Sequence, residues 1–219
     1  MSDKPNQLIG IEPTEKGQRA IERIKERFKV DSVPAPIEVL AGAENGIHDL
    51  YMNLNRQLAE GKVTEKVKLL VALGVAAATG SAKAVEFFTD AAIAAGWTRE
   101  QALEAIAVAN TCSIFNGYYR FRHQVPEDWK ASFEAFKAPF NANTFVKSGL
   151  EQIEVEAICV AVSSANHCHV CVEGHVNKAK SLGMTEEQVD ELIRAAAVAA
   201  AAGNIMSALN FQGSGAVTA

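Results

Sequence analysis

The sequence has no basic stripe, no leader-like start and no apolar run long enough to cross a bilayer. Its formal net charge is −5, which argues against a nucleic-acid partner. Residues 1–10 lack the basic and then apolar pattern of a signal peptide. The most apolar run, residues 195–209, contains Gly203, Asn204 and Ser207 and is too short for a membrane span. These absences favour a cytoplasmic protein with neither a membrane nor a nucleic acid as partner.

Cysteine and proline are also scarce, with 4 and 6 residues respectively. In a reducing cytoplasm, four cysteines do not suggest a disulfide framework, and a Cys-x-x-Cys pair is then more often catalytic or metal-binding. Hydrophobic residues make up 48% of the chain, as in an ordinary globular protein. Because alanine is abundant and glycine and proline are modest in number, the composition favours helix over sheet.

An internal repeat organises the chain. Gly96 is followed by an apolar residue, then by Thr98, with Gln101 three positions later, and the same order recurs from Gly183, 87 residues further on. Glycine often ends a helix, and threonine followed by glutamine at this spacing often caps the next one. We therefore predict a helical bundle built from two repeats. The expected divisions are an N-terminal helical extension at 1–62 and a domain at 63–219, with a non-catalytic repeat at 64–125, a linker at 126–149 and a catalytic repeat at 150–209.

The two copies differ at the residues that could carry chemistry. In the alignment of the repeats, Cys168 falls on Ser81, Cys171 on Ala84, His175 on Phe88 and Glu156 on Leu69. A purely structural requirement would have little reason to appear in only one of two equivalent helices. The difference therefore favours a functional site in the second copy.

The spacing of this group suggests a redox-active dithiol. In a helix, Cys168, Cys171 and His175 would share one face, because they are separated by three and four residues. A cap at Asn166 or Ser164 would place both thiols in the first turns, where the helix dipole lowers a thiol pKa. An antiparallel hairpin would return Glu156 beside His175, which could accept a proton from Cys171.

These four residues and their spacing resemble the signature of the AhpD-like alkylhydroperoxidases, in the carboxymuconolactone decarboxylase superfamily. Residues 116–123, Asn-Gly-Tyr-Tyr-Arg-Phe-Arg-His, resemble the tyrosine- and arginine-rich stretch that closes the first repeat in that family. The resemblance covers residues 64–209. One difference is Val170, where some members carry a histidine; here His167 and His169 lie nearby instead.

The resemblance implies an all-α, two-repeat fold, intertwined in a trimer or larger homo-oligomer. It also implies antioxidant reduction of organic hydroperoxides through a dithiol–disulfide cycle. In that cycle Cys171 attacks the peroxide, Cys168 resolves the product, and Glu156 and His175 relay the proton. No bound cofactor or metal is expected, and lipoyl groups of a partner protein are expected to act as the reductant.

Two other functions remain open from the sequence. One is a decarboxylase or lactone-handling enzyme, although that branch of the superfamily typically lacks the paired cysteines. The other is a non-enzymatic oligomer that binds metal or senses redox state, with Cys168, Cys171 and a histidine as possible zinc ligands. Cys112 and Cys159 are expected to be buried core residues.

Overall fold

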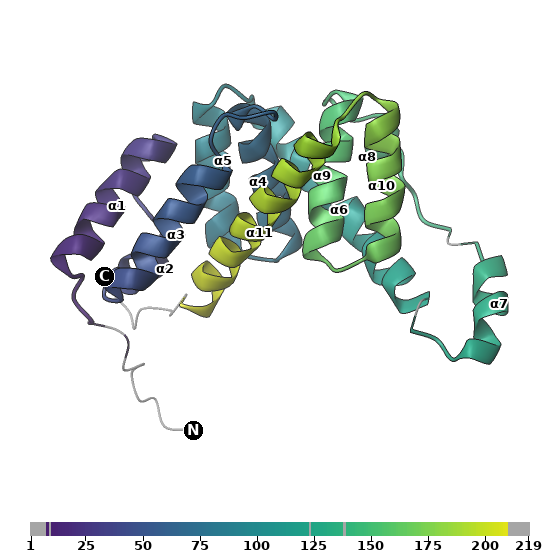
Figure 1. The fold of residues 1–219 in the computed structure, drawn as a ribbon, viewed down its shortest axis with the longest axis horizontal. Helices are drawn as coiled ribbons and strands as arrows, with labels where there is room; N and C mark the ends of the chain where they lie inside the picture. The colour runs from purple at the N-terminus through teal and green to yellow at the C-terminus, as the bar shows by residue number, and fades with distance from the viewer. Residues whose placement is uncertain (1–7, 9, 123, 138, 210–219) are drawn as a thin grey trace, which may run out of the picture.

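The computed structural model describes residues 8, 10–122, 124–137 and 139–209, and in these ranges the chain forms eleven helices and no strand (Figure 1). The first residues of the expected N-terminal extension and the last residues of the expected domain therefore lie outside the described residues. His123, the last residue of the 116–123 stretch, lies outside them as well. The helices are α1 (Glu15–Phe28), α2 (Ala35–Leu40), α3 (Glu44–Gln57), α4 (Glu65–Ala78), α5 (Ala82–Ala94), α6 (Arg99–Arg122), α7 (Glu127–Ala135), α8 (Asn143–Val146), α9 (Gln152–Ala165), α10 (His169–Ser181) and α11 (Glu186–Ala208).

The predicted repeat is present as α4–α5–α6 and α9–α10–α11. Both predicted capping boxes form: Thr98 and Gln101 exchange side-chain and backbone hydrogen bonds at the start of α6, and Thr185 and Gln188 do so before α11. Gly96 and Gly183, with φ of 98° and 94°, end the preceding helices in the left-handed region. The all-α prediction is confirmed for the described residues.

A second pair of turns follows the same repeat, one in each copy. The backbone N–H of Ser81 donates to Ala76 at 3.2 Å, and the N–H of Cys168 donates to Ser163 at 3.0 Å. Each turn joins the first helix of its copy to the second. Cys168 therefore lies at a turn whose backbone hydrogen bond recurs in both copies.

The core lies around α4 and α9, the first helix of each copy. Nine residues of each helix are buried, and most of these are aliphatic. Each helix contacts both long helices, α6 and α11. Burial on almost all sides explains the nearly continuous apolar sequence of these two helices.

A carboxylate on each long helix ties down the loop before the first helix of the other copy. Glu191 of α11 accepts the backbone N–H groups of Lys62 and Val63, each at 3.0 Å, just before α4. It also pairs at 2.7 Å with the buried ammonium group of Lys68. Glu104 of α6 accepts the Ser148 hydroxyl at 3.1 Å, just before α9. These links cross between the two repeats.

We expect Glu191→Gln to destabilise the fold by about 3 kcal/mol at pH 7, because it leaves the Lys68 cation buried without its anion. Burial alone would raise the pKa of Glu191, but the hydrogen bonds from Lys68, Val63 and Lys62 outweigh it and lower the pKa to about 2. The carboxylate thus contributes stability that is full above its unfolded pKa and lost as the pH falls toward 2. Urea unfolding of both proteins between pH 7 and pH 2 should show the difference shrinking below about pH 4.5.

Asp90→Asn, an exposed carboxylate on α5, is the matched control and should change the unfolding free energy by less than about 0.5 kcal/mol. Equal unfolding midpoints for Glu191→Gln and the parent protein at pH 7 would contradict the role given to this ion pair.

The three N-terminal helices pack at one end of the molecule (Figure 1). Thr14 caps α1 as a side-chain acceptor for the Gly17 N–H at 2.9 Å. Apolar residues of α1, including Ile24 and Phe28, belong to the same hydrophobic cluster as the central helices. Both α2 and α3 contact α11. The division of the chain at residue 62 stays a prediction.

Helix α7 projects from the end of α6, away from the rest of the ribbon (Figure 1). It buries none of its residues. Trp129 and Phe136 are about half exposed, at 55% and 54%, and both contact Phe133. These rings form an aromatic surface rather than part of the core.

Among the described residues, no helix has both the length and the apolar character needed to cross a bilayer.

Candidate active site

The α9–α10 hairpin brings together the four residues singled out in the sequence. Glu156 lies in α9 and is 5% exposed. His175 lies in α10, and its Nδ1 is 2.8 Å from a carboxylate oxygen of Glu156. Gln152, one turn before Glu156, donates to the other oxygen at 3.3 Å. The predicted return of Glu156 to His175 is therefore confirmed.

Cys168 and Cys171 form a disulfide, with Cα atoms 5.3 Å apart. Cys171 lies in the first turn of α10, as predicted. The predicted cap is wrong, because Cys168 itself occupies the N-cap position, and Asn166 ends α9. The Asn166 side chain instead donates to Asn116 at 3.0 Å, and so links the turn to α6.

A buried polar network lies behind His175, and the sequence did not indicate it. The Cys112 sulfur of α6 lies 3.3 Å from the Ser163 hydroxyl of α9 and 3.7 Å from the backbone carbonyl of Cys159. Asn116, one turn further along α6, donates to the same hydroxyl at 3.0 Å. Cys112 and Cys159 are buried, as expected, but they also adjoin the imidazole. The sequence carried a partial indication of this network, because Cys159 follows Glu156 by three residues and so shares its helix face. Nothing comparable indicated Cys112.

Electrostatics favour a charged imidazole in this structure. Burial alone would lower the pKa of His175, but its hydrogen bonds with Cys112 and Glu156 outweigh this effect and raise the pKa to about 9. Hydrogen bonding to Cys159, assisted by His175 and Ser163, lowers the pKa of the Cys112 thiol against the opposing effect of burial. His175 is thus a cation between two groups that favour its charge, and it can donate a proton at neutral pH.

A set of possible metal ligands also lies here. Among the described residues, the donor atoms of Cys112, Cys159 and His175 lie within 4.8 Å of one another. These are not the thiols proposed as zinc ligands from the sequence. In this structure Cys168 and Cys171 are joined to each other, so a zinc site on that pair would require their reduction.

A cavity of about 580 Å³ opens onto Cys171, His175 and Glu156. Its other walls include Phe115 and Tyr119 of α6 and Phe145 of α8. The Phe145 ring stands edge-on to the imidazole, with centroids 5.8 Å apart. Aromatic walls around a few reactive groups suit a small organic molecule with one polar end.

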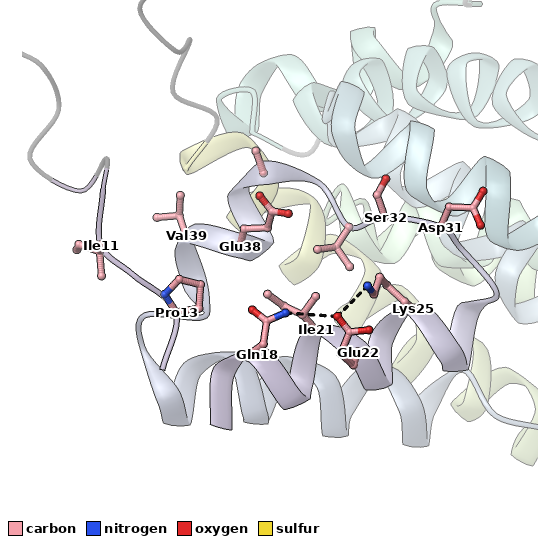
Figure 2. Close-up of a pocket in the computed structure, with 12 residues that line it drawn as sticks. Ile11, Pro13, Gln18, Ile21, Glu22, Lys25, Asp31, Ser32, Glu38 and Val39 are labelled. Carbon is pink, nitrogen blue, oxygen red and sulfur yellow. Dashed lines mark hydrogen bonds and ion pairs between the residues drawn. The ribbon is translucent and has the colours of Figure 1, made fainter. Parts of the chain in front are cut away.

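Another cavity, of about 430 Å³, is built only from residues 11–39 of the N-terminal segment (Figure 2). Its charged side chains include Glu22, which is bound to Gln18 and Lys25. Neither cysteine nor histidine lines it. It therefore lacks the chemistry of the α9–α10 site.

Comparisons with known proteins converge on one family. The carboxymuconolactone decarboxylase family matches residues 46–116 and 131–212. The chain is 36% identical to an alkyl hydroperoxide reductase AhpD of Anaeromyxobacter dehalogenans, over 70% of this chain and 81% of that protein. It is 31% identical to an alkyl hydroperoxide reductase AhpD of Coxiella burnetii, over 68% of this chain and 84% of that protein.

A solved structure from Burkholderia xenovorans LB400 has a similar fold. It is described as a candidate gamma-carboxymuconolactone decarboxylase subunit and superimposes with a TM-score of 0.60, covering 90% of this chain and 98% of that one. At 15% identity, this likeness concerns the fold alone.

Proposed function

Because the chain belongs to the carboxymuconolactone decarboxylase family, we propose that it is an alkyl hydroperoxidase that works through the Cys168–Cys171 pair. Its AhpD relatives support an alkyl hydroperoxide reductase type of activity. The observation that carries the proposal is that Cys171, one sulfur of a disulfide, shares a cavity with the hydrogen-bonded Glu156–His175 pair. A nucleophile and a proton donor thus face the same space.

The oxidative half of the cycle begins with the reduced pair. The Cys171 thiolate attacks the terminal oxygen of the hydroperoxide, the O–O bond breaks, and the alkoxide leaves as an alcohol after taking a proton from His175. Cys171 is then a sulfenic acid. The Cys168 thiolate attacks its sulfur, the hydroxide leaves as water after protonation, and the disulfide forms. Two electrons pass from the two thiolates to the peroxide.

Glu156 holds the imidazole in place and favours its charged form. Its carboxylate is 7% exposed, so water screens its attraction for His175 only weakly. The N-terminus of α10 adds a positive potential at Cys171, which favours the thiolate. Cys112 also favours the charged imidazole, because its hydrogen bond with His175 raises the pKa of that group.

Reduction of the disulfide by lipoyl groups of a partner protein, in a reducing cytoplasm, is part of the proposal through the family resemblance. A homo-oligomer is proposed on the same basis. The exposed aromatic rings of α7 support self-association, because a protruding helix without buried residues gains a core only by packing against another surface.

Counting thiols tests the proposal. The reduced protein should show four thiols after denaturation and two after one equivalent of cumene hydroperoxide, because Cys112 and Cys159 stay reduced. Dihydrolipoamide should restore all four, and each equivalent of hydroperoxide should yield one equivalent of alcohol. Four thiols remaining after exposure to the hydroperoxide would refute the peroxidase.

A further inference from the structure

The two cysteines of the disulfide line different cavities, and both are largely buried, with Cys168 1% and Cys171 8% exposed. Cys171 lines the cavity that contains Glu156 and His175. Cys168 lines another, of about 460 Å³, which contains neither of those residues. Val170 lines both cavities and so stands between them. The disulfide therefore has one cysteine at the proposed peroxide cavity and the other at a separate cavity.

The cavity at Cys168 is rich in nitrogen donors. Arg120, Gln124, His167 and His169 line it, together with Val170, and no carboxylate is among these residues. The Arg120 guanidinium donates to the backbone carbonyl of Asn166 at 3.1 Å, and no ion pair joins it to a carboxylate among the described residues. Arg120 gives the lining a positive formal charge in a protein whose net charge is −5. Such a site attracts an anionic partner.

His167 occupies a backbone position that normally favours glycine. Its φ is 56°, in the left-handed region. Its counterpart in the first repeat, 87 residues earlier, is Gly80, with φ of 72°. The N–H of each residue donates to the carbonyl three positions before it, Ser164 or Ala77. Glycine suits this left-handed position best, and an L-residue is strained there. The second repeat nevertheless has His167, with an exposed imidazole, where the first repeat has Gly80.

We infer that the Cys168 cavity is the docking site for the reductant, and that it binds a carrier protein presenting a dithiol beside acidic side chains. This inference rests on the proposed function, in which the disulfide must be reduced after each turnover. Arg120, His167 and His169 act as positioning residues that hold the acidic segment of the carrier. The hydroperoxide and the reductant thus approach the disulfide from different sides.

The chemistry assigns a direction to the reduction. A thiolate of the carrier attacks the Cys168 sulfur, a new S–S bond forms, and the Cys168–Cys171 bond breaks with its electron pair on Cys171. The second thiolate of the carrier then attacks the carrier sulfur of the mixed disulfide, which releases Cys168. The carrier leaves as a disulfide, oxidised by two electrons, and Cys168 takes up a proton from water. The first step regenerates the Cys171 thiolate in the peroxide cavity.

The test measures the reductive half-reaction alone, with protein oxidised beforehand by ferricyanide, so that it does not depend on peroxidase activity. The probes are a reduced lipoyl domain of net negative charge and neutral dihydrolipoamide. At low salt, we expect His167→Gly and Arg120→Gln each to slow reduction by the domain about tenfold, and to leave reduction by dihydrolipoamide unchanged. High salt should slow the reaction of the parent protein with the domain to a similar extent.

Matched measurements separate docking from folding. His167→Gly should raise the midpoint of thermal unfolding by about 2–4 °C, because it relieves the left-handed strain. A more stable variant that is reduced more slowly by the domain cannot be explained by misfolding. Lys83→Gln removes a partly buried cation, paired with Glu86, near the equivalent turn of the first repeat and should leave both rates unchanged. If either cavity variant slowed both probes equally, or if neither slowed the domain, the docking site would be refuted.

Discussion

Cys171→Ser is expected to abolish hydroperoxide consumption, with a loss of at least about 10³-fold in turnover. Serine keeps the size of the side chain, but its hydroxyl is not ionised at neutral pH and cannot form the sulfenic acid. The rate of alcohol formation from cumene hydroperoxide, with dihydrolipoamide as reductant, measures the loss. Because serine matches cysteine closely in size and residue 171 lies in the first turn of α10, the fold should be retained.

Cys168→Ser is the companion variant and should behave differently. It keeps the attacking sulfur but cannot form the disulfide, so a single equivalent of hydroperoxide should leave a sulfenic acid on Cys171 that dimedone traps. Steady turnover should fall. Cys159→Ser, at a thiol outside the pair, serves as the control for loss of any cysteine and should not give a trappable species. Normal turnover of Cys168→Ser with dihydrolipoamide would show that the roles of the two thiols are assigned wrongly.

Glu156→Gln is expected to lower turnover by about 10²-fold and to move the alkaline limb of the pH profile toward lower pH. Glutamine keeps the shape of the side chain and can still hydrogen-bond, but it removes the negative charge 2.8 Å from His175. A cation loses stability when its anionic neighbour is removed, so the pKa of His175, which is about 9, should fall. The variant should therefore lose its protonated imidazole at a lower pH than the parent protein does.

The pH profile distinguishes this role from a structural one. Gln152→Ala is the matched control, because it removes only a neutral hydrogen bond at 3.3 Å to Glu156. It should leave the alkaline limb of the pH profile almost unshifted. A Glu156→Gln variant with reduced turnover but an unshifted limb would contradict the assignment of Glu156 as the group that maintains the charge of His175.

Much of the fold follows from local sequence. The capping boxes at Thr98 and Thr185 involve residues three positions apart, and their hydrogen bonds form wherever a helix begins there. The same is true of the Cys168–Cys171 pair, whose spacing alone places the sulfurs within reach of each other. The return of Glu156 to His175 was predictable because a short turn between two helices makes them antiparallel.

The cap of α10 was mispredicted for a physical reason. Asn166 has the residue type of an N-cap, but its amide is drawn to Asn116 and Ser113 of α6 instead. The sequence cannot show that competition, because it depends on a helix about 50 residues earlier. Local propensity yields when a tertiary contact satisfies the same polar group.

By itself, the sequence determined the helices, their repetition after 87 residues and the presence of a dithiol in only one copy, because each depends on residue types at short or periodic spacing. Only the tertiary structure decided what surrounds the dithiol. It placed Cys112 of α6 against Ser163 of α9, 51 residues away, and against His175, and it formed a different cavity beside each cysteine of the disulfide. Those features arise from how three helices pack, and packing at that distance leaves no spacing pattern in the chain.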